Sequence, residues 1–294
     1  MTVTPEKLIA KWDQVTKFDQ NATYPTSTAE SIEQIMANCG ADSESSDPAS
    51  ESGTPQMEDY LDLEDSEVVA QAKRETIDPI ELPHTKRECI LYNLGVGATK
   101  KELKYVFEGS SNFQVIPSYG MLAFNEASKQ MPCMYDLYFN LHDPLLDWLP
   151  DFSLMMLLHG EHYLVIKTPK IPTSSTLVHH AQIFEATDKG KAASVVLINH
   201  TYDKDSGTLF ENQATLFIRG SGGFGGRKVG KDRGAATALN KPPNRAPDAI
   251  SIEKTDLNQA ELYRSSGDTN PSHTNPDFAA VGGFKSPILH GLCF

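Results

Sequence analysis

Cysteine is scarce in this sequence, and its positions fit neither a metal site nor a disulfide framework. The four cysteines are Cys39, Cys89, Cys133 and Cys293, and no CxxC pair occurs. Zinc sites and redox pairs need such short spacings, and small disulfide-stapled domains need more cysteine for their length. We therefore expect reduced thiols in an intracellular protein, without a metal or a redox cofactor of its own.

Basic residues and long apolar runs are also in short supply. The 294 residues include 26 Lys and Arg against 39 Asp and Glu, which gives a net charge of −13 at pH 7. Phosphate backbones need a basic face, so we expect no nucleic-acid partner. No run approaches the ~20 apolar residues of a membrane span. The N-terminal MTVTPEKLIAKWDQ lacks a signal-peptide core, and we expect no membrane association.

The chain is long enough for about two domains, and its composition changes along its length. Short helical pieces are expected within residues 1–39, with Thr28 as a candidate N-cap. From Gly40 to about Asp65, Ser, Asp, Glu and Pro predominate, which is typical of a flexible acidic linker. Residues 1–66 are thus predicted to be a connector-like segment with a disordered acidic linker.

Helical and strand patterns follow that segment. An apolar helical stripe passes through Ile90, Leu91, Leu94, Leu103, Val106 and Phe107. Residues 161–168, 176–186, 193–202 and 209–220 are rich in β-branched and aromatic side chains, which predicts a meander of four strands. The glycine-rich GSGGFGG at 220–226 has no strand-to-helix GxGxxG context, so a flexible connection is favoured over a nucleotide loop.

Two short motifs recur in the same order, which indicates an internal duplication. ILYNLGVGAT at 90–99 is echoed by ELYRSSGDTN at 261–270, and LLHG at 157–160 is echoed by ILHG at 288–291. The second copy has an acid and an imidazole where the first has neither. One catalytic half and one supporting half are expected.

The stretch SSGDTNPSHTNPDF places Asp268 and His273 five residues apart between prolines. On a helix, five residues would put them about 140° out of line. Pro271 and Pro276 favour an irregular loop instead, in which the two side chains can converge. An acid and an imidazole that converge are suited to proton transfer.

LYRSSGDTNPSH, PDFA and PILHGLC together resemble the signature of the MaoC-like, type-two enoyl-CoA hydratases, and the resemblance covers about residues 85–294. It implies an α+β double hot-dog fold, in which a long helix is wrapped by an antiparallel sheet. The implied domains are a non-catalytic N-terminal hot dog at 67–226 and the start of a catalytic C-terminal one at 227–294. The second is expected to be incomplete, because three residues follow Gly291.

The resemblance also implies the chemistry and its residues. Water would add to a trans-2-enoyl-CoA and give a (3R)-3-hydroxyacyl-CoA, in fatty-acid β-oxidation or a related fungal route. The implied catalytic residues are Asp268, Asn270 and His273, and the implied substrate contacts are His159, Gly160, Lys189 and Gly291. No cofactor is expected, because CoA is part of the substrate. A peroxisomal location is implied, although GLCF is not a common peroxisomal address, so a cytoplasmic location also stays open.

Several alternatives stay open at this point. Lys189 in TDKGK is either a contact of a CoA phosphate or a solvated turn lysine. Ser272 and Thr274 stand where the family usually has apolar residues, so His273 is expected to be held less tightly. The chain is either a hydratase, with low activity in isolation, or a non-catalytic acyl-CoA-binding or interaction remnant. A homodimer and an association with other β-oxidation enzymes are both compatible with the sequence.

Overall fold

The computed structural model describes residues 60–75, 78–122, 145–153, 156–238, 243–250, 252, 254–268 and 270–293. The chain divides into two compact units, one of Met1–Gly53 with Asn240–Asp256 and the other of Thr54–Leu239 with Leu257–Phe294. All helices and strands below belong to the second unit. The helical pieces expected before Gly40, and Cys39 and Cys133, lie outside the described residues.

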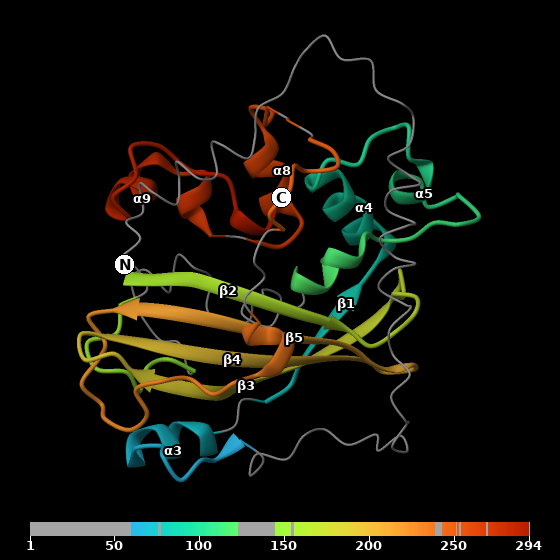
Figure 1. Ribbon diagram of the computed structural model, residues 1–294. Helices are drawn as coiled ribbons and strands as arrows, with labels where there is room; N and C mark the ends of the chain where they lie inside the picture. Colours follow the sequence, from blue (N-terminus) through green and yellow to red (C-terminus); the bar gives the residue numbers. More distant parts are fainter. Residues whose placement is uncertain are drawn as a thin grey trace. The chain divides into compact units, whose positions relative to one another are not determined.

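A five-stranded antiparallel sheet forms the centre of this unit (Figure 1). Its strands are β1 (Ile80–His84), β2 (Leu157–Ile166), β3 (Ser175–Asp188), β4 (Ala192–Asp203) and β5 (Gly207–Arg219). The four runs of β-branched and aromatic residues therefore form strands, as the sequence predicts. Runs of this kind pack well on a pleated surface.

The order of the strands is β1-β3-β4-β5-β2, which differs from a simple meander. Strands β3, β4 and β5 are consecutive neighbours, but β2 pairs with β5 and not with β3. The expected four-strand meander is wrong in this respect. The short strand β1 takes the place beside β3, with Pro83 in it, and Pro is tolerated at a sheet edge.

Short helices connect and flank the strands. They are α3 (Glu67–Arg74), α4 (Lys86–Gly95), α5 (Leu103–Val106), η2 (Pro117–Met121), η4 (Gly234–Thr237), α8 (Gln259–Ser265), η5 (Pro271–His273), α9 (Pro276–Val281) and η6 (Gly291–Cys293). None of the helices in the described ranges has the length and apolar character needed to cross a bilayer.

The apolar stripe that begins at Ile90 is divided between two helices. α4 starts with a capping box between Thr85 and Glu88 and ends at Gly95. Gly97 then takes a φ of 95°, a left-handed conformation that stops the helix, and α5 follows. The single stripe expected across Leu94 and Leu103 is therefore interrupted by a turn.

α4 and α8 carry the two copies of the Leu-Tyr motif, and they lie side by side (Figure 1). The glycine at position 95 allows this close contact, since a Cβ there would lie 3.1 Å from Cα of Tyr263. Gln259 Nε2 also donates to the Gly95 carbonyl. The helix that precedes the Asp268 loop is thus docked on a helix of the first half of the chain.

One apolar cluster joins these two helices to the sheet. Its fully buried rings include Tyr92, Phe210 and Tyr263, each 0% exposed, and Cys89 and Cys293 are also buried in it. Burying one large apolar side chain contributes about 1.5–3 kcal/mol. Both described cysteines are free thiols. Burial raises the pKa of the Cys89 thiol to about 12 and also raises that of Cys293, which favours the protonated thiol.

The glycine-rich segment binds a carboxylate of its own chain. The backbone N–H groups of Gly190, Gly223 and Gly225 donate to Asp188 over 2.7, 3.0 and 2.7 Å. All three glycines have positive φ, which aims their amides inward. The bonds from Gly223 and Gly225 lower the pKa of Asp188. The anion site of this loop is therefore occupied internally, in agreement with a connecting segment.

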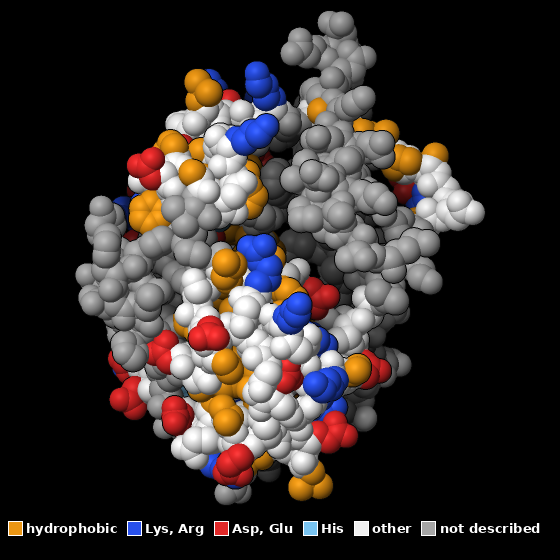
Figure 2. All heavy atoms as spheres, turned by 90° about the vertical axis from the view of Figure 1, so that its left-hand side faces the viewer, with side chains coloured by type: hydrophobic (Ala, Val, Ile, Leu, Met, Phe, Trp, Pro, Cys, Tyr) orange, Lys and Arg blue, Asp and Glu red, His pale blue; other side chains and the backbone are white. Residues whose placement is uncertain are grey.

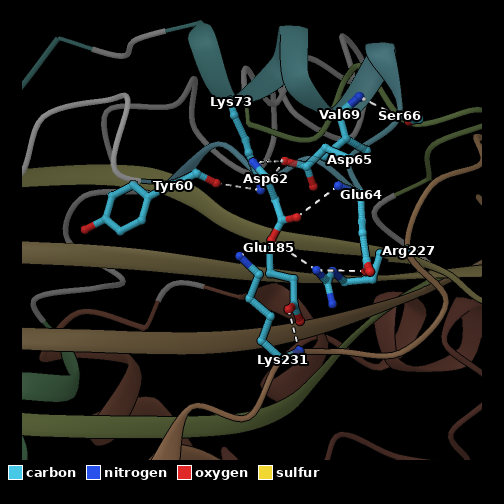
Figure 3. Close-up of polar contacts among 10 residues, drawn as sticks. All are labelled: Tyr60, Asp62, Glu64, Asp65, Ser66, Val69, Lys73, Glu185, Arg227 and Lys231. Carbon is cyan, nitrogen blue, oxygen red and sulfur yellow. Dashed lines mark hydrogen bonds and ion pairs between the residues drawn. The ribbon is translucent and has the colours of Figure 1, made fainter.

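The end of the acidic linker is paired rather than solvated (Figure 3). Of residues 40–65 the structure describes 60–65. Asp65 forms an ion pair with Lys73 at 2.7 Å, and Asp62 pairs with Arg227 at 3.0 Å and with Lys231. Cations from α3 and from residues 227–231 neutralise these described acids. The assignment of residues 1–66 to a connector stays a prediction.

Candidate active site

A glycine and two turns shape the loop that holds Asp268 and His273. α8 ends at Ser265, and Gly267 adopts a φ of 149°, which is unfavourable for other residues. The chain then reverses at Asp268, whose Oδ1 accepts from the backbone N–H of Asn270 at 3.3 Å. Pro271 starts the short helix η5, and His273 ends it. The predicted irregular loop is therefore present.

Asn270 is committed in part to its own loop. Its Oδ1 accepts from the backbone N–H of Ser272 at 3.0 Å and from the Ser272 hydroxyl at 2.7 Å. Asn270 is thus the N-cap of η5, and the Ser272 hydroxyl adds a bond to it that an apolar residue could not make. The Asn270 side-chain NH2 group keeps its donor capacity.

The tautomer of His273 follows from its hydrogen bond. His273 Nδ1 lies 2.8 Å from the carbonyl oxygen of Ile288. A carbonyl oxygen only accepts, so Nδ1 carries the proton. In the neutral ring, Nε2 is then the unprotonated nitrogen that can accept a proton.

His290 lies between the two predicted catalytic residues. Its ring packs on the ring of His273, with centroids 3.9 Å apart and planes inclined by 32°. Its Nε2 is 3.2 Å from the Asp268 carbonyl oxygen and 3.9 Å from Asp268 Oδ1. His290 is 1% exposed, and burial lowers its pKa to about 4 against the opposing charge of Asp268.

Aromatic rings continue from His290 into the core. Tyr263 packs on His290 with ring centroids 4.9 Å apart, and Tyr92 lies 6.2 Å from Tyr263. Tyr119 meets Tyr92 edge-on at 5.3 Å. The loop is therefore connected by tilted and edge-to-face ring contacts to helix α4 and to the first half of the chain.

Gly291 begins η6 directly after His290. Apart from its two chain neighbours, no described residue has an atom within 4 Å of the position that a Cβ would take there, so its α-carbon borders open space. The sequence expects Gly291 at the start of a helix, and the structure places it at the start of this three-residue 3-10 turn.

The charge of the same carboxylate acts on His159, which belongs to the first half of the chain. His159 lies on β2 and is exposed. The pKa of its imidazole is lowered overall, because desolvation by nearby atoms outweighs the opposing charge of Asp268. His159 Nε2 is 3.2 Å from His162 Nδ1, and His162 Nε2 is 2.8 Å from Asn212 Oδ1. Desolvation lowers the pKa of His162 to about 4.

Gly160 and Lys189 line a cleft of about 950 Å³ over the sheet. The positive side chains that line the cleft are Lys189, Lys231 and Arg233. Three acids balance their charge: Glu161, Glu185 and Asp232. Lys189 Nζ donates to the Lys228 carbonyl at 2.7 Å. On the side of the molecule in Figure 2, basic and acidic side chains are likewise intermingled among the described residues.

The structure thus gathers Asp268, Asn270, His273 and Gly291 around His290, and the charge of Asp268 acts on His159. Gly160 and Lys189 share the separate cleft. Sequence reasoning missed His290 and His162 as members of the site. The repeated His-Gly dipeptide was a signal for His290, whereas nothing in the sequence singles out His162. No group of three or more metal-ligating side chains occurs in the described ranges.

Two family models match the chain. Residues 83–220 match the MFE-2 hydratase 2 N-terminal domain, and residues 237–294 match the MaoC like domain. The crystal structure of a MaoC-like dehydratase from Phytophthora capsici is 30% identical, with a TM-score of 0.59 over 74% of this chain and 70% of that one. This likeness confirms the predicted α+β hot-dog class.

Curated relatives agree with these matches. A peroxisomal hydratase-dehydrogenase-epimerase of Neurospora crassa is 43% identical over 99% of this chain, which spans 30% of that protein. A peroxisomal multifunctional enzyme type 2 of Mus musculus is 34% identical, and the chain spans 37% of it. A probable enoyl-CoA hydratase 2 of Dictyostelium discoideum is 40% identical over 74% of this chain and 69% of that protein. The chain therefore belongs to the MaoC-like hydratase 2 family.

Proposed function

We propose that this chain hydrates trans-2-enoyl-CoA thioesters to (3R)-3-hydroxyacyl-CoA. The observation that carries the proposal is the convergence of Asp268 and His273 on one buried imidazole, His290, beside the open face of Gly291. An acid and a base held in fixed relation are what the addition of water across a double bond requires.

His273 and Asp268 share the handling of one water molecule in this proposal. The unprotonated Nε2 of His273 accepts a hydrogen bond from the water, since Nδ1 is engaged by the Ile288 carbonyl. The carboxylate of Asp268 holds the other hydrogen. The water oxygen bonds to C3 of the substrate, one of its protons passes to the pair, and a proton is delivered to C2. The atoms of one water are thus added in full.

Negative charge develops on the thioester oxygen as C3 is attacked, and a donor must face it. Gly291 fits this role because it starts η6 and lacks a side chain toward open space. The Asn270 side-chain NH2 group is a second donor for the water or the thioester, since Ser272 engages its oxygen. Losing one such donor typically costs ~10²–10³ in rate.

His159 and Gly160 are proposed to contact the acyl-CoA on the side of the first half of the chain. The electrostatic effect of Asp268 on His159 supports this position. Lys189 is proposed as a contact of a CoA phosphate. The balanced charge of its cleft and its bond to Lys228 leave solvation as the other role of this lysine.

The wider setting is proposed from the relatives. The relatives from Neurospora crassa and Mus musculus are named peroxisomal, so we propose a peroxisomal site of action in β-oxidation. CoA belongs to the substrate, and no separate cofactor takes part in the proposed reaction. A homodimer or an association with other β-oxidation enzymes would fit a chain that matches part of a multifunctional protein. The division into halves at 67–226 and 227–294 stays a prediction.

The test is the disappearance of a medium-chain trans-2-enoyl-CoA in the presence of the purified chain, followed by analysis of product chirality. Asp268→Asn and His273→Gln are expected to lower kcat by ~10²–10⁴. Asp277→Asn is the matched control, because Asp277 is an exposed acid on α9 nearby in sequence. The 3R product, lost in the two variants and kept in the control, supports the proposal.

Turnover no greater than that of Asp268→Asn would contradict the proposal. Binding of a saturated acyl-CoA without turnover would then favour the alternative of a non-catalytic acyl-CoA-binding chain. Absence of both binding and turnover would favour an interaction segment of a multifunctional enzyme.

A further inference from the structure

His290 is the most buried imidazole near the loop, and its surroundings are unusual for a core histidine. It is 1% exposed, between the ring of Tyr263 on one side and that of His273 on the other. It is also in direct reach of the Asp268 backbone and side chain. One side chain thus contacts both members of the proposed catalytic pair.

The protonation of the His290 ring follows from its geometry. The Asp268 carbonyl only accepts, so Nε2 of His290 donates to it and carries the proton. Nδ1 of His290 is then the unprotonated nitrogen of a neutral ring, and it is buried without a hydrogen-bond partner among the described residues. A buried cation would meet no acceptor at Nδ1, which favours the neutral form.

We propose that His290 is a positioning residue of this site. Its Nε2–H donates to the Asp268 backbone carbonyl, and its ring packs on the face of the His273 ring. In this way His290 sets the distance between Asp268 and His273. The inference rests on the proposed function for its consequence in turnover, but the geometry it assigns to His273 and Asp268 is testable without turnover.

The positions of Ile288 and His290 strengthen the effect. Ile288 accepts from His273 Nδ1 through its carbonyl, and His290, two residues later, packs on the same ring. Asp268 and His273 are therefore both tied to one short segment, 288–290. Misplacing a catalytic group by about 1 Å can cost ~10² in rate.

Three substitutions separate the two contacts of His290. His290→Phe keeps a flat ring on His273 but removes the donor to Asp268. His290→Gln keeps an N–H donor at similar reach but removes the ring, and His290→Ala removes both. His180→Gln on β3 is the matched control for His290→Gln, because it replaces a half-buried histidine of the sheet by glutamine.

Two measurements are made on the full chain. The first is kcat and KM per folded molecule, with the folded fraction taken from circular dichroism. The second is the tautomer of His273, from long-range ¹H–¹⁵N correlation of the imidazole nitrogens. We expect kcat to fall ~10²-fold in His290→Ala, with KM changed less, and to recover at least partly in the Phe and Gln variants. His273 should show one Nδ1–H tautomer in the wild type. It should show a mixture in His290→Ala, because a ring without the support of His290 is no longer held on the Ile288 carbonyl.

A purely structural role would lower the folded fraction but leave kcat per folded molecule and the His273 tautomer unchanged, and that result would overturn the inference. If the wild-type chain hydrates no enoyl-CoA, the proposed function fails, and the imidazole spectra alone decide the role of His290. A single His273 tautomer that persists in His290→Ala then refutes it, and a mixture supports it.

Discussion

Replacing Lys73 with methionine removes the cation from the ion pair with the least exposed side chains in the described part of the chain. Lys73 Nζ is 2.7 Å from Asp65 Oδ2, and both side chains are 1% exposed. The same ammonium donates to the Tyr60 carbonyl at 2.8 Å. Figure 3 shows these contacts joining α3 to the segment before it. Methionine keeps most of the apolar stem, so the change isolates the charge.

The cost of the change follows from what Asp65 retains. Its Oδ2 keeps one donor, the Asp62 backbone N–H at 3.0 Å, and loses the ammonium. An unpaired buried charge of this kind destabilises a fold by about 3–5 kcal/mol. That is a large share of the about 5–15 kcal/mol that separates a native domain from its unfolded state. The urea midpoint should therefore fall by on the order of 1 M or more.

Arg74→Met is the matched control, since it removes the same charge from the next position of α3. Arg74 pairs with Glu67 at 3.7 Å, but the two side chains are 48% and 89% exposed. Exposed ion pairs contribute about 0–1 kcal/mol to stability, so the urea midpoint of this variant should lie close to that of the wild type. Adding Asp65→Leu to Lys73→Met should recover stability, because no buried charge remains unpaired. Equal midpoints for Lys73→Met and Arg74→Met would refute the reasoning.

Three further changes test other parts of the molecule. Asp188→Asn weakens three amide contacts and should cost about 1.5–3 kcal/mol in urea unfolding at neutral pH. Since the folded-state pKa of Asp188 is lowered, this stability is present above the ordinary carboxyl pKa and is lost on acidification. The difference in unfolding free energy between Asp188→Asn and the wild type should shrink below about pH 4. A difference that stays constant with pH would contradict this role of the carboxylate. Gly95→Val places a side chain against Tyr263 and should lower stability by about 1–3 kcal/mol; an unchanged melting temperature would argue against that helix contact. Ser272→Ala removes one of the two donors to Asn270 Oδ1, the hydroxyl, and keeps the backbone N–H. It should lower kcat more than it changes KM, whereas a change in KM alone would place Asn270 in binding only.

Local patterns predicted the strands well and their pairing poorly. β3, β4 and β5 have long β-branched runs and short turns, so both their extent and their order followed from sequence. β2 lies beside β5, far from it in the sequence, and no local sequence pattern predicts such a long-range pairing. β1 was missed because IELPH is short and contains Pro83. The beginning of β2 was missed because LLHG has the same composition as the apolar segment before it.

Some features of the candidate site could likewise be predicted from the sequence, and others could not. Asp268 and His273 stand out by residue type, by the prolines around them and by the family signature. The carbonyl of Ile288 has no side-chain signature, yet it fixes the tautomer of His273. The pairing of the linker acids was missed because Arg227 and Lys231 come from more than 160 residues further along the chain. Charge runs indicate solvation only when no distant cation folds against them.

The internal duplication acquires a physical meaning at Asp268. His159 and His290 hold equivalent places in the repeated His-Gly motif, and both feel the charge of this one carboxylate. Desolvation nevertheless lowers the pKa of each ring below its ordinary value. At neutral pH the two rings are therefore mainly uncharged, and Asp268 is not neutralised by two cations. A carboxylate neutralised by two imidazolium ions would attract a water proton weakly. With neutral rings, the charge of Asp268 stays available for the proton transfer that the proposed hydration requires.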